Sequence, residues 1–570
     1  MSEDRPWLKS YDPHVPKEFD FPRRGLGELL AEALSAYPDR PACWMMEREI
    51  RFSELDVLAR RFAAWLLRNG LAKGDVVAIS LPNCPQYLIA HIGTILAGGV
   101  SCGCSPLLSA PEVAYQLNDS GTRFLVTLDA IYEKVLGKIR DDVPRLAGVV
   151  TTNVADYMGL SGLKVWLGKK LGKIPHGRVD PWSGKLVVGL AETLTTPETQ
   201  NVATVDPEND VALLYYTGGT TGHPKGAELT HASVTANLHQ AISWMGWKPS
   251  GEVGLSAFPL FHMAGMMVCN ASLVLSCPQV LIANPRDTGR ILAEFTRRRP
   301  TWLANVPSLY QMLLRDPGIS KLPADVLDGV RAYLSAAAPL ASETFRRLET
   351  VLRAEGKILE LYGMTEASPV ITANPFLGRK KIGSIGLPLP GTDLRIESLE
   401  TGEPVPPGQP GEIVCRGPQV MRGYRGKPEE TANTLRGGWL HTGDVAVMDE
   451  DGYLTIVDRL KDMIIVGGFK VFSTHVEEIL SRHPQVELAA TIGVPDPERP
   501  GSELVRAVIQ LRGADPADRA AQEDVRRYAK ENLSSYENPR QWDFRAAIPL
   551  TTVGKVSKLA LRKELASTTA

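Results

Sequence analysis

An apolar run, Val211-Ala-Leu-Leu-Tyr-Tyr216, leads directly into the loop sequence Thr217-Gly-Gly-Thr-Thr-Gly-His-Pro-Lys-Gly226. The run predicts a buried strand, so the loop lies at a strand end, where open α/β sheets place their ligands. Glycines let backbone N–H groups approach a polyphosphate, hydroxyls add donors, and Lys225 adds a positive charge. The loop is not a Walker A loop, because Gly226 stands where that motif needs Ser or Thr. The pattern favours phosphate binding, with a simple turn as the alternative.

The composition indicates a large protein with little net charge. Its 570 residues exceed a single core, so we expect two or more domains. The net charge of −2 gives no basic excess that would indicate nucleic acid as a partner. The first residues lack the apolar core of a signal peptide, and seven scattered cysteines suit a reducing compartment, so we expect a cytoplasmic protein. We interpret Cys102 and Cys104 as buried small residues near a strand end rather than a metal site.

Alternating helix and strand patterns follow the polar, Pro-rich residues 1–25, for which we expect a surface arm. The patterns predict helices over 26–37 and from a capping box at 53–56 to Gly70, a strand over 75–80, a helix over 87–96 and a strand over 124–127. Such alternation predicts an α/β fold with doubly wound parallel sheets. Residues 253–285 carry no Asp, Glu, Lys or Arg, but prolines divide them, so buried strands and a helix explain them better than a membrane span.

Residues 155–178 interrupt this alternation. They predict a helical apolar stripe with Trp166 nearby and lysines on the other faces; the stripe comprises Leu160, Leu163, Leu167, Leu171 and Ile174. A basic amphipathic helix can lie on an anionic membrane surface. We favour the alternative, a surface helix that covers its own domain with solvated lysines, because four glycines weaken the helix.

Six further motifs follow in order. They are Phe258-Pro-Leu-Phe-His-Met-Ala-Gly265, Ser335-Ala-Ala-Ala-Pro339, Leu361-Tyr-Gly-Met-Thr-Glu366, Gly438-Trp-Leu-His-Thr-Gly-Asp444, Asp458-Arg-Leu-Lys-Asp462 and Pro549-Leu-Thr-Thr-Val-Gly-Lys555. Each is weak alone, but with the opening loop they resemble the adenylate-forming acyl-CoA synthetase superfamily over nearly the whole chain. The opening Pro6-Trp-Leu-Lys-Ser-Tyr11 and Gln116-Leu-Asn-Asp-Ser-Gly121 are most similar to bacterial long-chain fatty acyl-CoA synthetases.

The resemblance implies an acid–thiol ligase that works in two steps. A carboxylate attacks the α-phosphate of ATP and expels pyrophosphate, and the thiol of coenzyme A then attacks the acyl-adenylate and expels AMP. Bringing two anions together needs a cation, Mg²⁺ and preorganised donors. The expected partners are therefore a carboxylic acid, ATP and coenzyme A. A homodimer, common among relatives, and peripheral membrane contact through 155–178 stay open.

The resemblance also implies roles for individual residues. Catalytic roles fall to Lys555, which stabilises charge during adenylation, to Thr365, to Glu366 as the Mg²⁺ ligand, and to His262 at the acyl site. Tyr362 is expected to pack on adenine and Asp444 to bind the ribose, while Arg459 is expected to contact the ribose or a phosphate. The expected nucleotide- and coenzyme-binding set comprises Thr217, Gly218, Gly219, Thr220, Thr221, Gly222, Lys225, Ala337, Tyr362, Gly363, Asp444, Arg459, Gly467, Gly468 and Lys470.

Two domains follow from the same resemblance. We expect a large ATP- and acyl-binding domain over 1–458 and a small mobile α+β domain over 459–570 that turns about Lys461 between the steps. The glycine pair that precedes Phe469 would then face the site and admit the thiol arm of coenzyme A.

The chain departs from the superfamily pattern at two places. Phe472-Ser-Thr-His475 stands where Tyr-Pro-x-Glu is common, which puts the thioester step in doubt. Ser335-Ala-Ala-Ala338 replaces a glycine-rich stretch, and its methyl groups alter the adenine and acyl pocket. Other functions therefore remain open: a ligase for a medium-chain, aryl, alicyclic or dicarboxylic acid, an acyl-AMP ligase that feeds a carrier protein, or a catalytically inactive binding relative.

Overall fold

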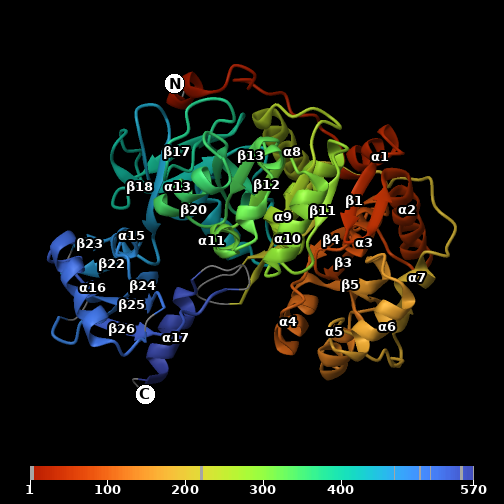
Figure 1. Ribbon diagram of the computed structural model, residues 1–570. Coiled ribbons are helices and arrows are strands. Elements are labelled where there is room, and N and C mark those ends of the chain that lie inside the picture. The colour runs from red at the N-terminus through yellow and green to blue at the C-terminus, as the bar shows by residue number, and fades with distance from the viewer. Residues whose placement is uncertain are drawn as a thin grey trace.

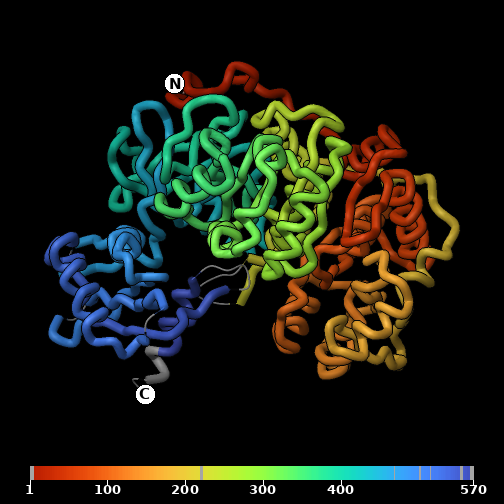
Figure 2. Tube along the Cα trace, viewed as in Figure 1, coloured from red at the N-terminus to blue at the C-terminus, as the bar shows by residue number. Residues whose placement is uncertain are grey.

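The computed structural model describes residues 5–217, 223–467, 469–499, 502–513, 515–551 and 556–568. A large lobe carries most of these residues, and the chain after the four-stranded sheet forms a smaller lobe, blue in Figure 1. Figure 2 shows the same two lobes along the Cα trace, with the N-terminal arm running across the outside of the large one.

An eight-stranded sheet contains the strand predicted before the phosphate-type loop. Its order is β19 (Gly423–Tyr424), β9 (Lys225–Thr230), β8 (Val211–Thr217), β4 (Val100–Gly103), β3 (Val76–Ser80), β5 (Thr122–Leu128), β6 (Gly148–Thr152) and β7 (Leu186–Gly189). Strands β8 to β7 are parallel, whereas β9 returns antiparallel to β8. The helices of this part are α2 (Phe52–Arg68), α3 (Pro85–Leu96), α4 (Ala110–Ser120), α5 (Asp129–Lys134), α6 (Gly162–Lys170), α7 (Leu190–Thr193) and α8 (His231–Met245).

A nine-stranded sheet forms the second layer. Its order is β16 (Leu387–Pro388), β15 (Val370–Ala373), β14 (Ile358–Gly363), β13 (Ala332–Ser335), β12 (Trp302–Asn305), β10 (Gly254–Ser256), β11 (Gln279–Leu281), β1 (Pro41–Met45) and β2 (Arg48–Arg51). Its central strands, β14 to β1, are parallel. The accompanying helices are α1 (Leu26–Ala36), α9 (Met263–Val274), α10 (Thr288–Arg298), α11 (Pro307–Arg315), α12 (Ala324–Asp328) and α13 (Ser342–Val351). The two sheets confirm the predicted doubly wound fold.

An antiparallel sheet links the two lobes. It consists of β17 (Asp393–Glu397), β18 (Pro410–Arg416), β20 (Leu440–Met448) and β21 (Leu454–Arg459), with α14 (Pro428–Thr434) before β20. The small lobe contains the hairpin β22 (Ile464–Val466) and β23 (Phe469–Val471) and a sheet of β24 (Val486–Pro495), β25 (Glu503–Leu511) and β26 (Gln541–Arg545). Helices α15 (Ser473–Ser481), α16 (Arg519–Asn532) and α17 (Lys558–Thr568) complete it.

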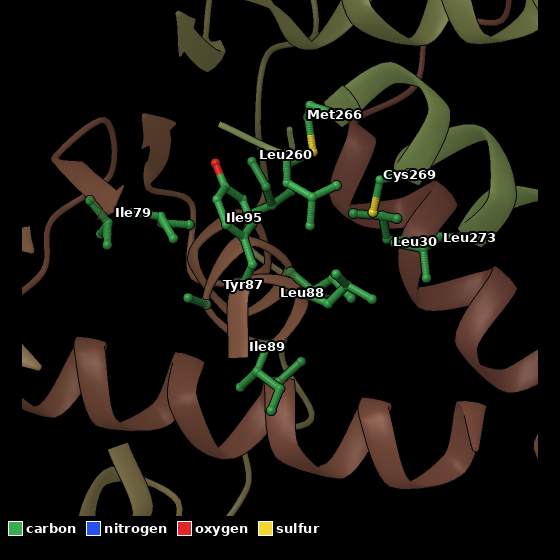
Figure 3. Packing of buried hydrophobic residues seen from close by; sticks show 14 of the residues in the cluster. Leu30, Ile79, Tyr87, Leu88, Ile89, Ile95, Leu260, Met266, Cys269 and Leu273 are labelled. Carbon is green, nitrogen blue, oxygen red and sulfur yellow. The ribbon is translucent and has the colours of Figure 1, made fainter. Parts of the chain in front are cut away.

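The charge-free stretch 253–285 lies in the core, as predicted. It forms β10, α9 and β11, and the apolar side of α9 packs against α1. Figure 3 shows Met266, Cys269 and Leu273 of α9 close to Leu30 of α1. The same buried cluster includes Tyr87 of α3, so α9 joins the two large sheets into one core.

The structure corrects two local predictions. No capping box starts α2: Phe52 is fully buried and donates its N–H to Arg40 O, so the helix begins one residue before Ser53. The predicted helix in 155–178 is shorter, because α6 ends at Lys170 and Gly172 takes a φ of +67°. The N-terminal arm lies along the outside of the large lobe (Figure 2), as predicted, and Trp7, only 3% exposed, attaches it there.

Candidate active site

Asp444, in the middle of β20, meets Tyr362, which lies near the end of β14. The Tyr362 hydroxyl donates to Asp444 Oδ2 over 2.7 Å, and Arg459 Nε lies 2.9 Å from Asp444 Oδ1. Asp444 and Arg459 are register partners in β20 and β21, which brings the ion pair together. Asp444 is buried, and its charge raises the pKa of Arg459. Tyr362 and Arg459 therefore hold in place the Asp444 carboxylate, which is predicted to bind the ribose.

A second buried carboxylate lies on the 3₁₀ turn after β14. Glu366 is 4% exposed, Thr365 beside it is also buried, and the Tyr424 hydroxyl donates to Glu366 Oε1 over 2.6 Å. Burial raises the pKa of the Glu366 carboxyl, while the Tyr424 hydrogen bond and the charge of Lys225 oppose that rise. The Lys225 ammonium lies 5.1 Å from the centre of the Tyr424 ring. Tyr424 therefore links a cation and a carboxylate.

Thr217 and Lys225 form the base of the phosphate-type loop. They are register partners at the ends of β8 and β9. Residues 218–222, which include the predicted Gly218, Gly219, Thr220, Thr221 and Gly222, lie outside the described residues. The β8–β9 hairpin therefore places Thr217 opposite Lys225, and the Lys225 ammonium lies over the Tyr424 ring.

Three further predicted residues lie at the ends of helices or strands of the large lobe. His262 precedes α9 and is its N-cap residue. Ala337 follows β13 with a φ of 73°, a left-handed conformation that favours glycine. At Gly363 a Cβ atom would stand 1.9 Å from Pro369 O, so only glycine fits at the end of β14.

The small lobe carries the remaining predicted residues. Gly467 takes a φ of +56° at the hairpin turn and donates its N–H to Ser502 Oγ over 2.8 Å. Lys470 pairs with Glu400 of the large lobe over 2.8 Å. Gly468 and Lys555 lie outside the described residues. The structure therefore brings Tyr362, Asp444 and Arg459 together in one group and Glu366 and Lys225 in another, and holds Gly467 and Lys470 on the small lobe.

Sequence reasoning missed a polar cluster that joins the lobes. Buried Asp458 accepts hydrogen bonds from Ser473 N and from Ser473 Oγ, the latter over 2.9 Å. Lys558 contacts Ser473 Oγ and Glu477 Oε1, each over 2.7 Å. Tyr424 was missed as well. The Gly-Tyr pair at 423–424 was the sole sequence signal, and nothing local connects it with Glu366.

The site has features of a nucleotide-binding enzyme, and the comparisons agree. The profile of the AMP-binding enzyme family matches residues 30–425, and that of the AMP-binding enzyme C-terminal domain matches 475–555. The chain therefore belongs to the AMP-binding enzyme family, which confirms the resemblance and the prediction of an enzyme.

Three relatives illustrate the range of similar proteins. The chain is 36% identical to a long-chain-fatty-acid–CoA ligase of Bacillus subtilis over 99% of both chains. It is 34% identical to a feruloyl-CoA synthase of an Amycolatopsis species over 95% of this chain and 99% of that one. Among solved structures, an anthranilate CoA ligase in complex with anthranoyl-AMP matches with a TM-score of 0.82 at 25% identity, over 97% of this chain and 99% of the other.

Neither a cluster of metal-binding side chains nor a membrane-spanning helix occurs in the part of the chain that the structure describes. No group of three or more His, Cys, Asp and Glu side chains there could hold a metal ion. Within the same ranges no helix is long and apolar enough to cross a membrane.

Proposed function

We propose that the chain is an AMP-forming acid–thiol ligase that joins a long-chain fatty acid to coenzyme A, using ATP. The observation that carries the proposal is the end-to-end likeness to the Bacillus subtilis long-chain-fatty-acid–CoA ligase. The feruloyl-CoA synthase and the anthranilate ligase favour a second candidate, a ligase for an aryl acid.

In the first step, the large lobe binds the nucleotide. Asp444 accepts hydrogen bonds from the ribose hydroxyls, while Tyr362 and Arg459 hold its carboxylate in place. Lys225 and Thr217 contact the phosphates, together with residues 218–222. His262 lines the acyl site, and Ala337 lies beside the adenine and acyl pocket. Lys555 completes the charge stabilisation when the carboxylate attacks.

Glu366 is the proposed Mg²⁺ ligand. A hard cation takes oxygen ligands, commonly one or two carboxylates together with substrate phosphates. A buried carboxylate near Lys225 fits that donor set, and the Tyr424 hydroxyl donates a hydrogen bond to Oε1 of Glu366. When bound, Mg²⁺ would neutralise phosphate charge; Tyr424 fixes the carboxylate beforehand.

In the second step, the small lobe over 459–570 turns about Lys461 relative to residues 1–458. Two interlobe ion pairs, Lys470–Glu400 and Arg315–Glu487, hold the arrangement described. Both are partly exposed, and such pairs contribute about 0–1 kcal/mol each. These two pairs therefore oppose the rotation only weakly, and the stronger link between the lobes is the pair of hydrogen bonds from Ser473 to buried Asp458.

We also propose peripheral contact of α6 with an anionic membrane. The helix buries none of its residues, so it does not cover its own domain with an apolar face. Leu163 is 73% exposed and Trp166 57%, and Leu167 and Leu171 are exposed beside them. Lys164 and Lys170 flank these side chains, and Lys170 lies over the Trp166 ring at 5.0 Å. Such a surface would reach a substrate that partitions into lipid.

The proposed function is tested with a panel of acids from acetate to palmitate, with benzoate and ferulate. AMP and acyl-CoA are measured for each acid with and without coenzyme A. We expect thioester formation to be most efficient with long-chain acids. A maximum at an aryl acid would favour the second candidate, and AMP release without thioester would indicate another acyl acceptor. Omitting the acid is the blank, and a Lys555→Ala variant should lose more of the adenylation rate than of the thioester rate.

A further inference from the structure

Helix α4 carries a sequence motif that the proposed reaction does not use. Asp119 belongs to the stretch Gln116-Leu-Asn-Asp-Ser-Gly121, and Tyr115 directly precedes that stretch. The two residues are four positions apart, so their side chains lie on the same face of the helix. Asp119 Oδ1 is 3.4 Å from the Tyr115 hydroxyl oxygen, which makes the two side chains neighbours. Their other contacts lead to the two ends of the phosphate-type loop.

Tyr115 contacts the residues at the end of this loop. Its hydroxyl donates to Pro224 O over 2.9 Å. Its ring stacks on the ring of His223, with centroids 4.6 Å apart and planes at 21°. The last register pair of the β8–β9 hairpin is Thr217 with Lys225, so His223 and Pro224 lie beyond the strand pairing. Tyr115 therefore holds two loop residues that the pairing of the strands does not hold.

Asp119 restrains the strand that leads into the loop. The Tyr216 hydroxyl donates to Asp119 Oδ2 over 2.8 Å. Tyr216 is the register partner of Gly226, and a Cβ atom on Gly226 would stand 3.1 Å from the Tyr216 ring. The ring therefore lies against the returning strand while its hydroxyl is held by α4. The Lys427 ammonium, 3.6 Å from Asp119 Oδ1, offsets the charge of the carboxylate.

The helix itself is fixed at both ends of the segment that carries these side chains. Ser109 donates its N–H to Glu112 Oε2 over 2.8 Å in a capping box at the first turn. Buried Gln116 donates to Gly103 O, at the end of β4, over 2.8 Å. A side chain on an anchored helix positions its partners more precisely than one on a loop. The contacts of Tyr115 and Asp119 therefore exist before any nucleotide arrives.

We infer that Tyr115 and Asp119 are positioning residues for the phosphates of ATP, acting through the two ends of the phosphate-type loop. Backbone N–H groups bind phosphate only when the chain that carries them is held in one conformation. Segments anchored in advance reduce the ordering cost of binding, and preorganised donors stabilise charge as it develops. The inference rests on the proposed function, which supplies ATP as the substrate of this loop.

The test separates the phosphates of ATP from its nucleoside. Titration calorimetry without acid measures the Kd for ATP and the Kd for adenosine, which has the base and ribose but no phosphate. Tyr115→Phe keeps the ring stack and loses one hydrogen bond, so the Kd for ATP should rise about fivefold. Tyr115→Ala also loses the stack and should raise this Kd further. The Kd for adenosine should not change in either variant.

Asp119 is tested by a graded pair of variants. Asp119→Ala removes the acceptor of the Tyr216 hydroxyl and should raise the Kd for ATP at least tenfold. Asp119→Asn keeps an oxygen that can accept this hydrogen bond and should restore most of the affinity. The KM for ATP in acid-dependent pyrophosphate exchange should rise in the same order. Thioester formation from a supplied acyl-adenylate should not change, since that step needs no phosphate loop.

Tyr132→Phe is the matched control, because the Tyr132 hydroxyl also donates to a backbone carbonyl, that of Asp180, on the opposite side of the same sheet. Thermal melting checks that each variant is folded, and the nearly isosteric Tyr115→Phe keeps the test decisive if an alanine variant does not fold. An unchanged Kd for ATP in Tyr115→Phe, an equal rise for adenosine, or equal losses in both half-reactions would overturn the inference. Failure of the proposed function gives a different result, since the unaltered protein would then show no acid-dependent exchange with any acid.

Discussion

The Tyr424 hydroxyl donates a 2.6 Å hydrogen bond to Glu366 Oε1, although the two residues are 58 positions apart in sequence. The same ring lies beneath the Lys225 ammonium. A single side chain therefore sets the distance between the proposed Mg²⁺ ligand and a proposed phosphate contact. Its hydroxyl and its ring can be removed separately.

Tyr424→Phe keeps the ring and removes the hydroxyl. A hydrogen bond to a charged group contributes about 1.5–3 kcal/mol, so we expect acid-dependent pyrophosphate exchange to fall about 10- to 100-fold. Thioester formation from a supplied acyl-adenylate should change little. Tyr453→Phe is the control, since its hydroxyl donates to Arg379 O outside the site. Equal losses in both half-reactions would argue against a role in positioning Glu366.

Ala337 holds a left-handed conformation, so Ala337→Gly and Ala336→Gly should differ in stability. The first removes a backbone penalty of about 1–2 kcal/mol, which offsets the entropy that glycine loses on folding, about 0.5–1 kcal/mol. Ala336 has no such penalty to lose, since its φ is not positive. We expect Ala337→Gly to have the higher free energy of unfolding by about 1 kcal/mol. Urea unfolding measures it, and the reverse order would contradict the argument.

His91 predicts a loss of stability in mild acid. Its ring contacts Ser101 Oγ and Asn270 Oδ1, each over 3.0 Å, and burial lowers its pKa from 6.5 to about 4. The unfolded chain therefore binds a proton that the folded chain rejects, so this stability is present above pH 6.5 and is lost as the pH falls toward 4.

The loss between neutral pH and about pH 5 should be roughly 2 kcal/mol. His91→Gln should be less stable at neutral pH but should lose less on acidification. The variant should still lose some stability on acidification, because the pKa of buried His231 is also lowered to about 4. Unfolding curves over this pH range check the prediction. Parallel losses in the variant and the parent would exclude His91 as a cause.

Much of the candidate site could be predicted because its motifs are local. Asp444 and Arg459 face each other across neighbouring strands, and a short turn brings them into register. Tyr424 could not be predicted, because its contact depends on how β19 adds to the sheet beside β9. The predicted end of the helix in 155–178 was wrong for a different reason. Apolar residues continue at helical spacing past Lys170 in the sequence, but the left-handed conformation of Gly172 ends the helix.

The exposed face of α6 predicts binding to anionic vesicles. Replacing Trp166 and Leu167 together by serine removes two side chains that would each gain about 1.5–3 kcal/mol on burial in lipid. Flotation should then recover much less protein with the vesicles. Lys164→Gln should weaken binding to anionic vesicles about fivefold, since each lysine contributes about 1 kcal/mol there. Leu377→Ser is the control, because Leu377 is 68% exposed elsewhere on the large lobe. No flotation of the unaltered protein would exclude the contact.

Ser473→Pro would restore the proline that the superfamily pattern favours, yet we expect it to destabilise this chain. Proline suits the first turn of a helix, and Ser473 is the first residue of α15. Here, however, its N–H and its hydroxyl both donate to buried Asp458. Proline removes both donors and leaves that carboxylate partly unsatisfied, which should lower the free energy of unfolding by about 1–3 kcal/mol.

Ser473→Ala is the matched variant, because it keeps the N–H and loses only the hydroxyl. It should cost less than Ser473→Pro, and the difference measures the backbone hydrogen bond. Denaturant unfolding gives both values. Since Asp458 lies just before the proposed hinge at Lys461, Ser473→Pro should also slow the thioester step more than Ser473→Ala does. If proline were as stable as serine, Asp458 would not depend on that N–H, and the departure at 472–475 would need another explanation.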